Sequence, residues 1–195
     1  MSGTAADQAD PCASPVPMAS WYLIDGQDRI IDVSPDWDAA AEAGQGAVSS
    51  FRTGIIGQPL ARFLAGDTTR MFIDAALQAA RLTGRPRTLN YRCDTPLLAR
   101  QMQMRLVPGP QAEVRVEHVL LQSRPRTAPL RFVSAAAAPR PPGVSPWLRC
   151  SVCLWVCTPQ GYWEPPEHLQ AARPLVVDYT VCPRCHAEAA SPASG

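Results

Sequence analysis

Residues 21–34 have the sequence WYLIDGQDRIIDVS. Two short apolar runs, at 21–25 and 29–33, flank a turn that contains a glycine, and this arrangement predicts a β-hairpin. The hairpin leads directly into SPD (34–36), where a serine N-cap, a proline in the first turn and an early acidic residue predict the start of a helix. The domain is therefore expected to open with two strands followed by a helix.

The segment up to residue 123 continues with two more helices and three strands. A short helix is expected at 61–64 and a longer one from Asp67 to Gly84. Three strand-like runs follow, at 87–94, 100–108 and 113–123, and the second alternates apolar and polar residues with period two. The order β-β-α-α-α-β-β-β predicts an α+β domain in which an antiparallel sheet carries its helices on one face.

Helical spacing predicts which side chains form the core of this domain. The long helix is expected to bury the face made by Met71, Phe72, Ala75, Ala79 and Leu82. For the domain as a whole, the predicted core residues are Ile24, Ile31, Trp37, Ile56, Leu60, Phe63, Phe72, Leu77 and Met104.

Length and composition fit one ordinary domain with a small appendage. The chain has 195 residues, 46% of them hydrophobic and 18% charged, and 21 prolines that indicate linker sequence. A net charge of +1 gives no strong field toward nucleic acid or an acidic membrane. The expected division is a disordered arm at 1–19, a folded domain at 20–126, a Pro/Ala-rich linker at 127–146, a cysteine-rich module at 147–186 and a disordered tail at 187–195.

The sequence favours a reducing compartment. No run of 18 apolar residues occurs, so no membrane-spanning segment is expected. The N-terminal residues lack the charged and apolar blocks of a signal peptide, which predicts a cytoplasmic protein. Thiols stay reduced there, so the seven cysteines indicate metal binding or chemistry before disulfides.

The order of elements over residues 20–126 resembles that of PAS domains. The opening hairpin and IGQPL (56–60) are similar to PAS motifs, and YRCDTP (91–96) resembles a bacterial PAS-like subfamily. The resemblance implies a five-stranded antiparallel sheet with helices on one face, acting as a sensory or protein-interaction module. It also implies that a homodimer or a bound small molecule is an option.

Neither haem nor flavin is expected in this domain. The reactive-cysteine motif of light-sensing PAS domains is missing, and the domain's histidine, His118, lies in a predicted strand and not on the long helix. Met71, Phe72, Met102 and Met104 could line a metabolite pocket, or they could simply fill the core.

A basic stretch in the second half of the domain allows two interpretations. Six arginines lie from Arg81 to Arg105, with Asp94 as the single acidic residue among them. They could form an anion-binding patch or solvated strand edges, and we favour the edges. Cys93, beside these arginines, could be a reactive thiol, but we favour a buried inert one.

Two CxxC pairs dominate the C-terminal part. They are Cys150–Cys153 and Cys182–Cys185, with 28 residues between them. Each pair suits a tight turn that points two thiolates at one ion, and two such turns provide four sulfurs in a tetrahedron. Soft thiolates without an open position predict structural zinc.

The region 148–186 also resembles a short C-terminal module found in bacterial signalling proteins, which contains CSxC, a Gly-x-Trp segment and CPxC. Cys157 and His186 are spare groups, so ligand exchange with either stays open. Tyr162, Trp155 and Trp163 are expected to form the small apolar core of this module.

These features predict a small signalling protein whose output passes through a protein partner. A zinc-ribbon nucleic-acid binder is the alternative, but three arginines balance three acidic residues within 147–186, whereas modules that contact phosphates are basic. No nucleophile elbow, phosphate loop, metalloprotease helix or paired carboxylates are found, so no enzymatic activity is expected.

Overall fold

A computed structural model describes residues 19–43, 50–126, 129–137, 147–169 and 173–190. The chain forms an α+β structure with two five-stranded sheets. The first sheet has the order β2-β1-β5-β4-β3, and all four neighbouring pairs are antiparallel. Its strands are β1 (Ala19–Ile24), β2 (Ile30–Val33), β3 (Arg87–Arg92), β4 (Leu98–Pro108) and β5 (Val114–Pro125).

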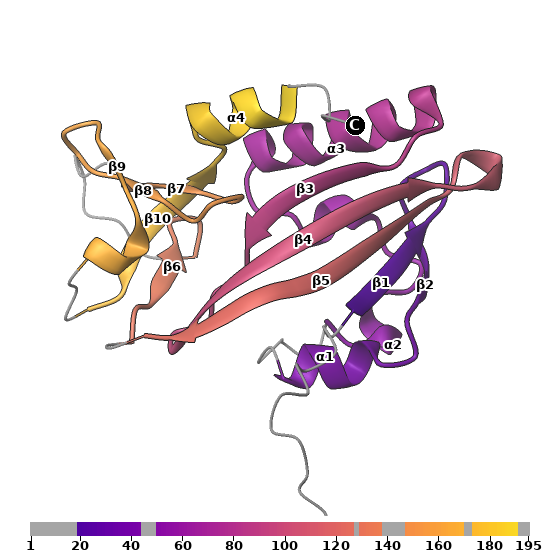
Figure 1. Ribbon diagram of the computed structural model, residues 1–195. Helices are drawn as coiled ribbons and strands as arrows, with labels where there is room; N and C mark the ends of the chain where they lie inside the picture. Colours follow the sequence, from indigo (N-terminus) through magenta and orange to yellow (C-terminus); the bar gives the residue numbers. More distant parts are fainter. Residues whose placement is uncertain (1–18, 44–49, 127–128, 138–146, 170–172, 191–195) are drawn as a thin grey trace, which may run out of the picture.

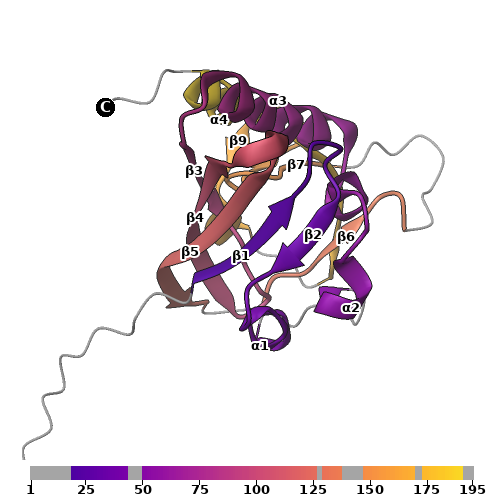
Figure 2. The same cartoon turned by 90° about the vertical axis from the view of Figure 1, so that its right-hand side faces the viewer.

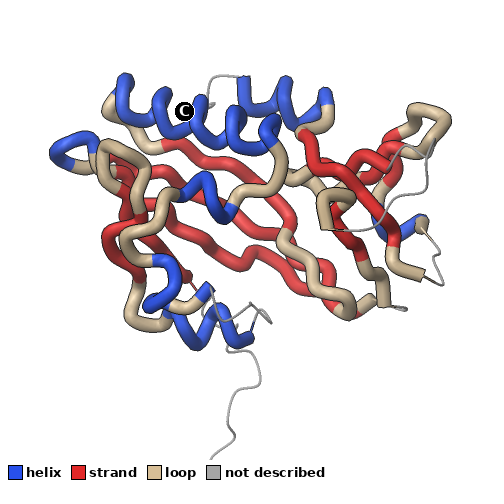
Figure 3. Tube along the Cα trace, turned by 180° about the vertical axis from the view of Figure 1, so that it is seen from behind, coloured by secondary structure: helices blue, strands red, loops and turns tan. Residues whose placement is uncertain are grey.

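Helices connect the hairpin to the last three strands of this sheet. They are α1 (Trp37–Ala43), α2 (Arg52–Ile55), the 3-10 helix η2 (Leu60–Phe63) and α3 (Asp67–Thr83), with a further 3-10 turn η3 (Pro110–Ala112) between β4 and β5. Figure 3 shows α1, α2 and α3 on one face of the sheet. Figure 2 shows α3 at one end of this face and α1 and α2 at the other. The predicted helix start at Ser34 is wrong: α1 begins at Trp37, and the Ser34 hydroxyl accepts the backbone N–H of Trp21.

The second sheet is mixed and has the order β6-β10-β7-β8-β9. Its elements are β6 (Phe132–Ser134), β7 (Trp147–Cys150), β8 (Val156–Cys157), β9 (Trp163–Glu164), the 3-10 helix η4 (Pro166–His168), β10 (Leu175–Thr180) and α4 (Pro183–Ala190). β6, β10 and β7 run parallel, while β8 and β9 are antiparallel additions. Figure 1 shows this sheet at one end of the first, with α4 beside α3.

The segments predicted as linker and as tail both contribute ordered residues to the second sheet and to α4. β6 lies inside the segment predicted as a linker, and it pairs with β10. Residues 187–190, predicted as tail, belong to α4. The arm at 1–18, the linker positions 127–128 and 138–146, and the last five residues lie outside the described residues.

The buried face of α3 differs from the predicted one. Met71 and Leu82 are 72% and 86% exposed, so their assignment to the core is wrong. The helix buries a neighbouring stripe made by Thr69, Ile73, Ala76, Leu77 and Ala80. Both stripes have helical spacing and both carry two alanines, so the position of β4 and β5, which α3 contacts, decides which stripe is buried.

The other core predictions divide in the same way. Ile24, Leu60 and Leu77 are buried, and Trp37, Phe72 and Met104 pack against the core while partly exposed. Ile31, Ile56 and Phe63 are between 38% and 39% exposed, so they were wrongly assigned. For Ile31 the reason is strand alternation, because Ile30 takes the inward position in β2 and its neighbour must face outward.

Arg81 ties the last turn of α3 to two hairpin turns. Its Nε donates to the carbonyl of Ala112 at 2.8 Å, in the β4–β5 turn. Its Nη2 donates to the carbonyl of Asp25 at 2.9 Å and to the Asp28 carboxylate at 2.7 Å, in the β1–β2 turn. Ala112 and Gln111 both have positive φ, so this side chain helps to hold a turn in the left-handed region.

Candidate metal centre

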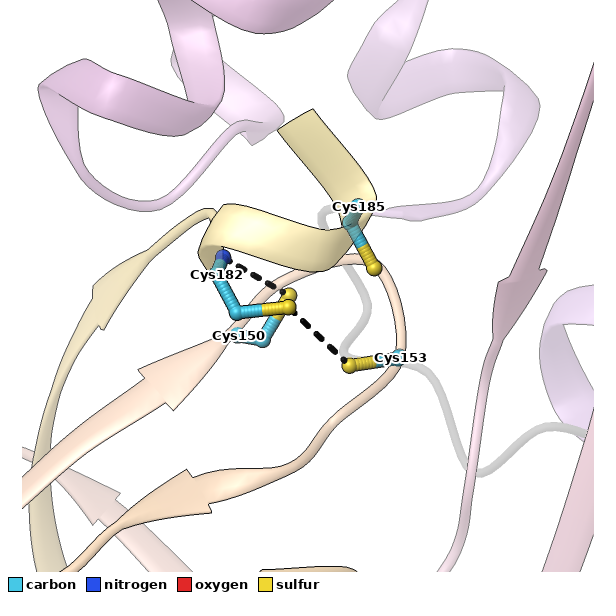
Figure 4. A group of neighbouring side chains, drawn as sticks. All are labelled: Cys150, Cys153, Cys182 and Cys185. Atoms are coloured by element: carbon cyan, nitrogen blue, oxygen red, sulfur yellow. Dashed lines mark hydrogen bonds between the residues drawn. The ribbon is translucent and has the colours of Figure 1, made fainter. Parts of the chain in front are cut away.

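The four predicted cysteines meet at one edge of the second sheet. Each offers a sulfur, and the four sulfurs all lie within 4.8 Å of one another. Figure 4 shows the side chains of Cys150 and Cys153 converging with those of Cys182 and Cys185. All four residues are buried, with exposed fractions between 0% and 8%. The structure therefore brings together the residues that the CxxC spacing singled out.

Strand direction explains why two distant CxxC pairs meet. β7 and β10 are parallel neighbours, and Thr180 pairs with Cys150. Parallel strands end at the same edge of a sheet, so the first pair, which begins at the last residue of β7, lies next to the second, which follows β10. Pro183 then starts α4, and a proline is well suited to the first position of a helix.

The first CxxC turn is closed by backbone hydrogen bonds. The N–H of Leu154 donates to the carbonyl of Cys150 at 3.0 Å, and the N–H of Cys150 donates to the carbonyl of Trp155 at 2.8 Å. Leu154 has a φ of 61°, a left-handed conformation that disfavours branched side chains. The turn therefore holds a conformation that the local sequence does not favour by itself.

The sulfur of Cys150 is the best-supported anion of the group. The N–H groups of Val152 and Cys182 donate to it at 3.4 Å each. Hydrogen bonds from the thiols of Cys153 and Cys185, more than the backbone bond from Cys182, lower the pKa of Cys150. The same hydrogen bond to Cys150 raises the pKa of Cys153 to about 11, and those to Cys150 and Cys153 raise the pKa of Cys185. Hydrogen bonds from two thiols thus converge on the Cys150 sulfur, and a soft cation bound by all four sulfurs could replace the thiol protons.

Arg184 supplies positive charge beside this group. Its guanidinium stacks on the ring of Trp155, 4.4 Å from the ring centre. Desolvation alone would lower the pKa of Arg184, but the sulfurs of Cys153 and Cys185 and the carboxylate of Glu188 raise it. A metal with four thiolates carries net negative charge, which this guanidinium would partly offset.

The donor set fits zinc or a similar metal ion. Four sulfurs held at about 2.3 Å from a central zinc in a tetrahedron lie about 3.8 Å apart. The sulfurs of Cys153 and Cys182 are 3.7 Å apart, one edge of such a tetrahedron. Four buried cysteines at this spacing could bind a metal such as zinc.

The spare groups lie outside the cluster. Cys157 is in β8, and its thiol faces the carbonyl of Thr158 at 3.7 Å. His186 is exposed on α4. Cys93 is exposed, with Arg100 Nη2 3.5 Å from its sulfur, so the expectation that it is buried is wrong.

The predicted arginine stretch contributes to a charge cluster that the sequence did not reveal. Asp94 is 3% exposed at its side chain and accepts hydrogen bonds from Arg92, Arg126 and the backbone of Arg100. Arg92 also pairs with Glu167 of the cysteine module. Among the described residues, the buried Nε of Arg126 has no hydrogen-bond partner. Arg92 is shared by Asp94 and Glu167, and these two carboxylates lie 73 positions apart in the chain. The local sequence therefore gives no signal for the cluster.

Two of the candidate pocket residues of the first domain, Met71 and Phe72, have different surroundings. Met71 lines an outer hollow of about 230 Å³ with Leu60 and Leu77, whereas Phe72 packs against both cores.

On β5, His118 lies against Tyr22 and accepts or donates a 2.8 Å hydrogen bond with the Tyr91 hydroxyl. Burial lowers the pKa of His118 to about 4, so this imidazole is neutral at pH 7.

Comparisons with known proteins give little beyond the geometry. No family model matches the chain, and no curated protein matches it. Among solved structures, a similarity is found to a domain of an HTR-like protein from Haloarcula marismortui ATCC 43049, at 14% sequence identity over 56% of this chain and 98% of that chain. Its TM-score is 0.36, which carries no fold assignment. Among the helices of the described residues, none combines the length and the apolar character needed to cross a membrane.

Proposed function

We propose that this chain is a small signalling protein in which a PAS-like sensing or interaction domain carries a structural zinc module. The observation that carries the proposal is the convergence of four buried cysteine sulfurs at the end of β7 and β10. The PAS-like assignment is supported by the order of elements and by the antiparallel sheet that joins the first two strands to the last three. Helices on one face of this sheet agree with it (Figure 3).

The metal is proposed to stabilise structure and not to catalyse a reaction. A catalytic zinc keeps one position open for water or substrate, whereas four cysteines complete a tetrahedron. The burial of all four cysteines supports the same conclusion, because a substrate would have to displace protein. Thiolate ligands must also stay reduced, which supports a cytoplasmic location.

The first domain is proposed to pass its output to a protein partner. It carries no catalytic signature in its sequence, so a signal would have to leave through a surface contact. A homodimer and a small molecule on the helix-covered face of the sheet are the arrangements that the PAS resemblance implies. Nucleic acid is not the proposed ligand, because the cysteine module has balanced charge.

Metal stoichiometry under reducing conditions tests the zinc module. Native mass spectrometry of the full chain should find one zinc per chain, and Cys→Ser at 150, 153, 182 or 185 should reduce zinc content sharply. Cys157→Ser is the matched control and should retain one zinc, because Cys157 lies outside the cluster. Wild-type protein that takes up no zinc would refute the module's proposed role.

A further inference from the structure

The two residues between the first pair of cysteines both bond to the first domain. The Ser151 hydroxyl lies 2.6 Å from the Thr69 hydroxyl in the first turn of α3. The Val152 carbonyl accepts the backbone N–H of Arg92 at 2.7 Å, at the last residue of β3. The turn from Cys150 to Cys153 therefore carries two candidate metal ligands and also contacts the edge strand β3 and the helix α3 of the first domain.

Val152 by itself links the sulfur of Cys150 to the first sheet. Its N–H donates to the Cys150 sulfur at 3.4 Å, while its carbonyl accepts from Arg92. Ser151 is fixed on its other side, because its N–H donates to the carbonyl of Thr180 at 2.8 Å. A change in the position of the Cys150 sulfur must therefore move the groups that β3 and α3 contact.

Apolar packing reinforces these hydrogen bonds. Phe72 of α3 packs against the core of the first sheet and also against the cysteine cluster. Gly66, just before α3, lies so close to Tyr179 of β10 that a Cβ there would be 2.7 Å from the Tyr179 carbonyl oxygen. We call these contacts, together with Thr69–Ser151 and Arg92–Val152, the seam.

We infer that metal binding at the four-cysteine centre holds the start of α3 and the end of β3 in place, so that metal occupancy controls the order of this part of the first domain. The inference rests on the proposed zinc module. The first CxxC turn has Leu154 in a left-handed conformation and brings four sulfurs close together, and metal binding would stabilise this arrangement. At such sites the free energy of metal binding contributes directly to folding. The seam depends on that conformation, so it should weaken when the metal leaves.

Thermodynamic linkage makes the coupling reciprocal. If zinc orders the seam, then a seam contact must strengthen zinc binding by the same factor. Thr69→Val removes one hydroxyl and keeps the shape of the side chain. Thr83→Val is the matched control on the same helix, because Thr83 is exposed and its hydrogen bonds within the described part of the chain go to carbonyls of its own helix and to the following turn.

The test combines zinc affinity with hydrogen exchange in the full chain. Competition with a chromophoric chelator should show zinc binding about fivefold weaker in Thr69→Val, the net effect of one lost hydrogen bond, and within about twofold of wild type in Thr83→Val. Removing zinc from the wild type should speed amide exchange at 67–75 and 88–94 by about tenfold, since several seam contacts open together, and leave 21–33 unchanged.

Each result decides between the two proposals. A wild type that binds no zinc refutes the zinc module. A wild type that binds zinc, with equal affinities in the two threonine variants and no zinc effect on exchange at 88–94, overturns the coupling and leaves the zinc module standing. Ser151→Ala, which removes the same hydrogen bond from the other side, should reproduce the Thr69→Val affinity. A Ser151→Ala affinity equal to that of the wild type also counts against the coupling.

Discussion

The buried carboxylate of Asp94 should be one of the most sensitive positions in the chain. It accepts hydrogen bonds from Arg92 at 2.6 and 3.2 Å, from the backbone of Arg100 at 2.9 Å and from Arg126. The side chains of Arg126 and Asp94 are 7% and 3% exposed, so water cannot replace the lost partner. Asp94→Asn keeps the shape but turns an amide donor toward guanidinium donors.

Two independent estimates give the expected cost. The variant loses about two charge-assisted hydrogen bonds at ~1.5–3 kcal/mol each. Removing one partner of a buried ion pair costs about 3–5 kcal/mol, which agrees with that sum. We therefore expect the free energy of unfolding to fall by about 3–5 kcal/mol.

Urea unfolding of the metal-loaded full chain measures this loss. Asp67→Asn is the control, because Asp67 pairs with Arg70 at 2.9 Å while its side chain is 91% exposed. An exposed pair contributes at most about 0.5 kcal/mol, so this variant should unfold close to the wild type. A loss below about 1 kcal/mol for Asp94→Asn would refute the reasoning, because it would mean that the two arginines find other partners or solvent at little cost.

Three further predictions concern packing, hairpin turns and pH. Gly66→Ala should lower the free energy of unfolding by about 2 kcal/mol or more, since its φ of 82° and the Tyr179 carbonyl both oppose a Cβ; an unchanged melting temperature would show that the contact is loose. Arg81→Ala removes three hydrogen bonds to two turns and should cost about 2–3 kcal/mol, with faster amide exchange at 25–29 and 108–113 as the signature. His118 has a pKa of about 4 in the folded chain against 6.5 unfolded, so the unfolded state binds its proton first and stability falls as pH drops from about 6.5 to 4. His118→Gln should lessen this acid loss by up to about 3 kcal/mol at pH 4, and parallel urea titrations of both proteins would show no difference if His118 is not the group responsible.

Local patterns in the sequence predicted most of the first sheet, because strands and helix ends depend on few neighbours. The helix expected from Asp67 to Gly84 is α3, and the alternating run at 100–108 lies within β4. The buried face of α3 could not be chosen in this way. Met71 and Ile73 both belong to apolar stripes with helical spacing, and only the position of β4 and β5 decides which stripe is covered.

The seam left even less trace in the sequence. Its contacts use the carbonyl of Val152 and a serine–threonine hydroxyl pair, and neither a backbone group nor a small hydroxyl produces a pattern that indicates a distant partner. β6 is similarly hidden, because three residues in a Pro/Ala-rich stretch form a strand only where β10 offers an edge. Pairing partners far apart in the chain are what single-sequence patterns do not encode.

The long gap between the two CxxC pairs follows from the parallel pairing of β7 and β10. Antiparallel strands can be joined by a short turn, whereas parallel strands need a crossover of a dozen or more residues. β8, β9 and η4 make up this crossover, and they return the chain to the start of β10 so that both strands end at one edge. The 28 residues between the pairs, more than the 15–20 of common zinc ribbons, accommodate this crossover together with β10 itself. The same geometry directs the first CxxC turn toward β3, so the topology that assembles the centre also places it against the first domain.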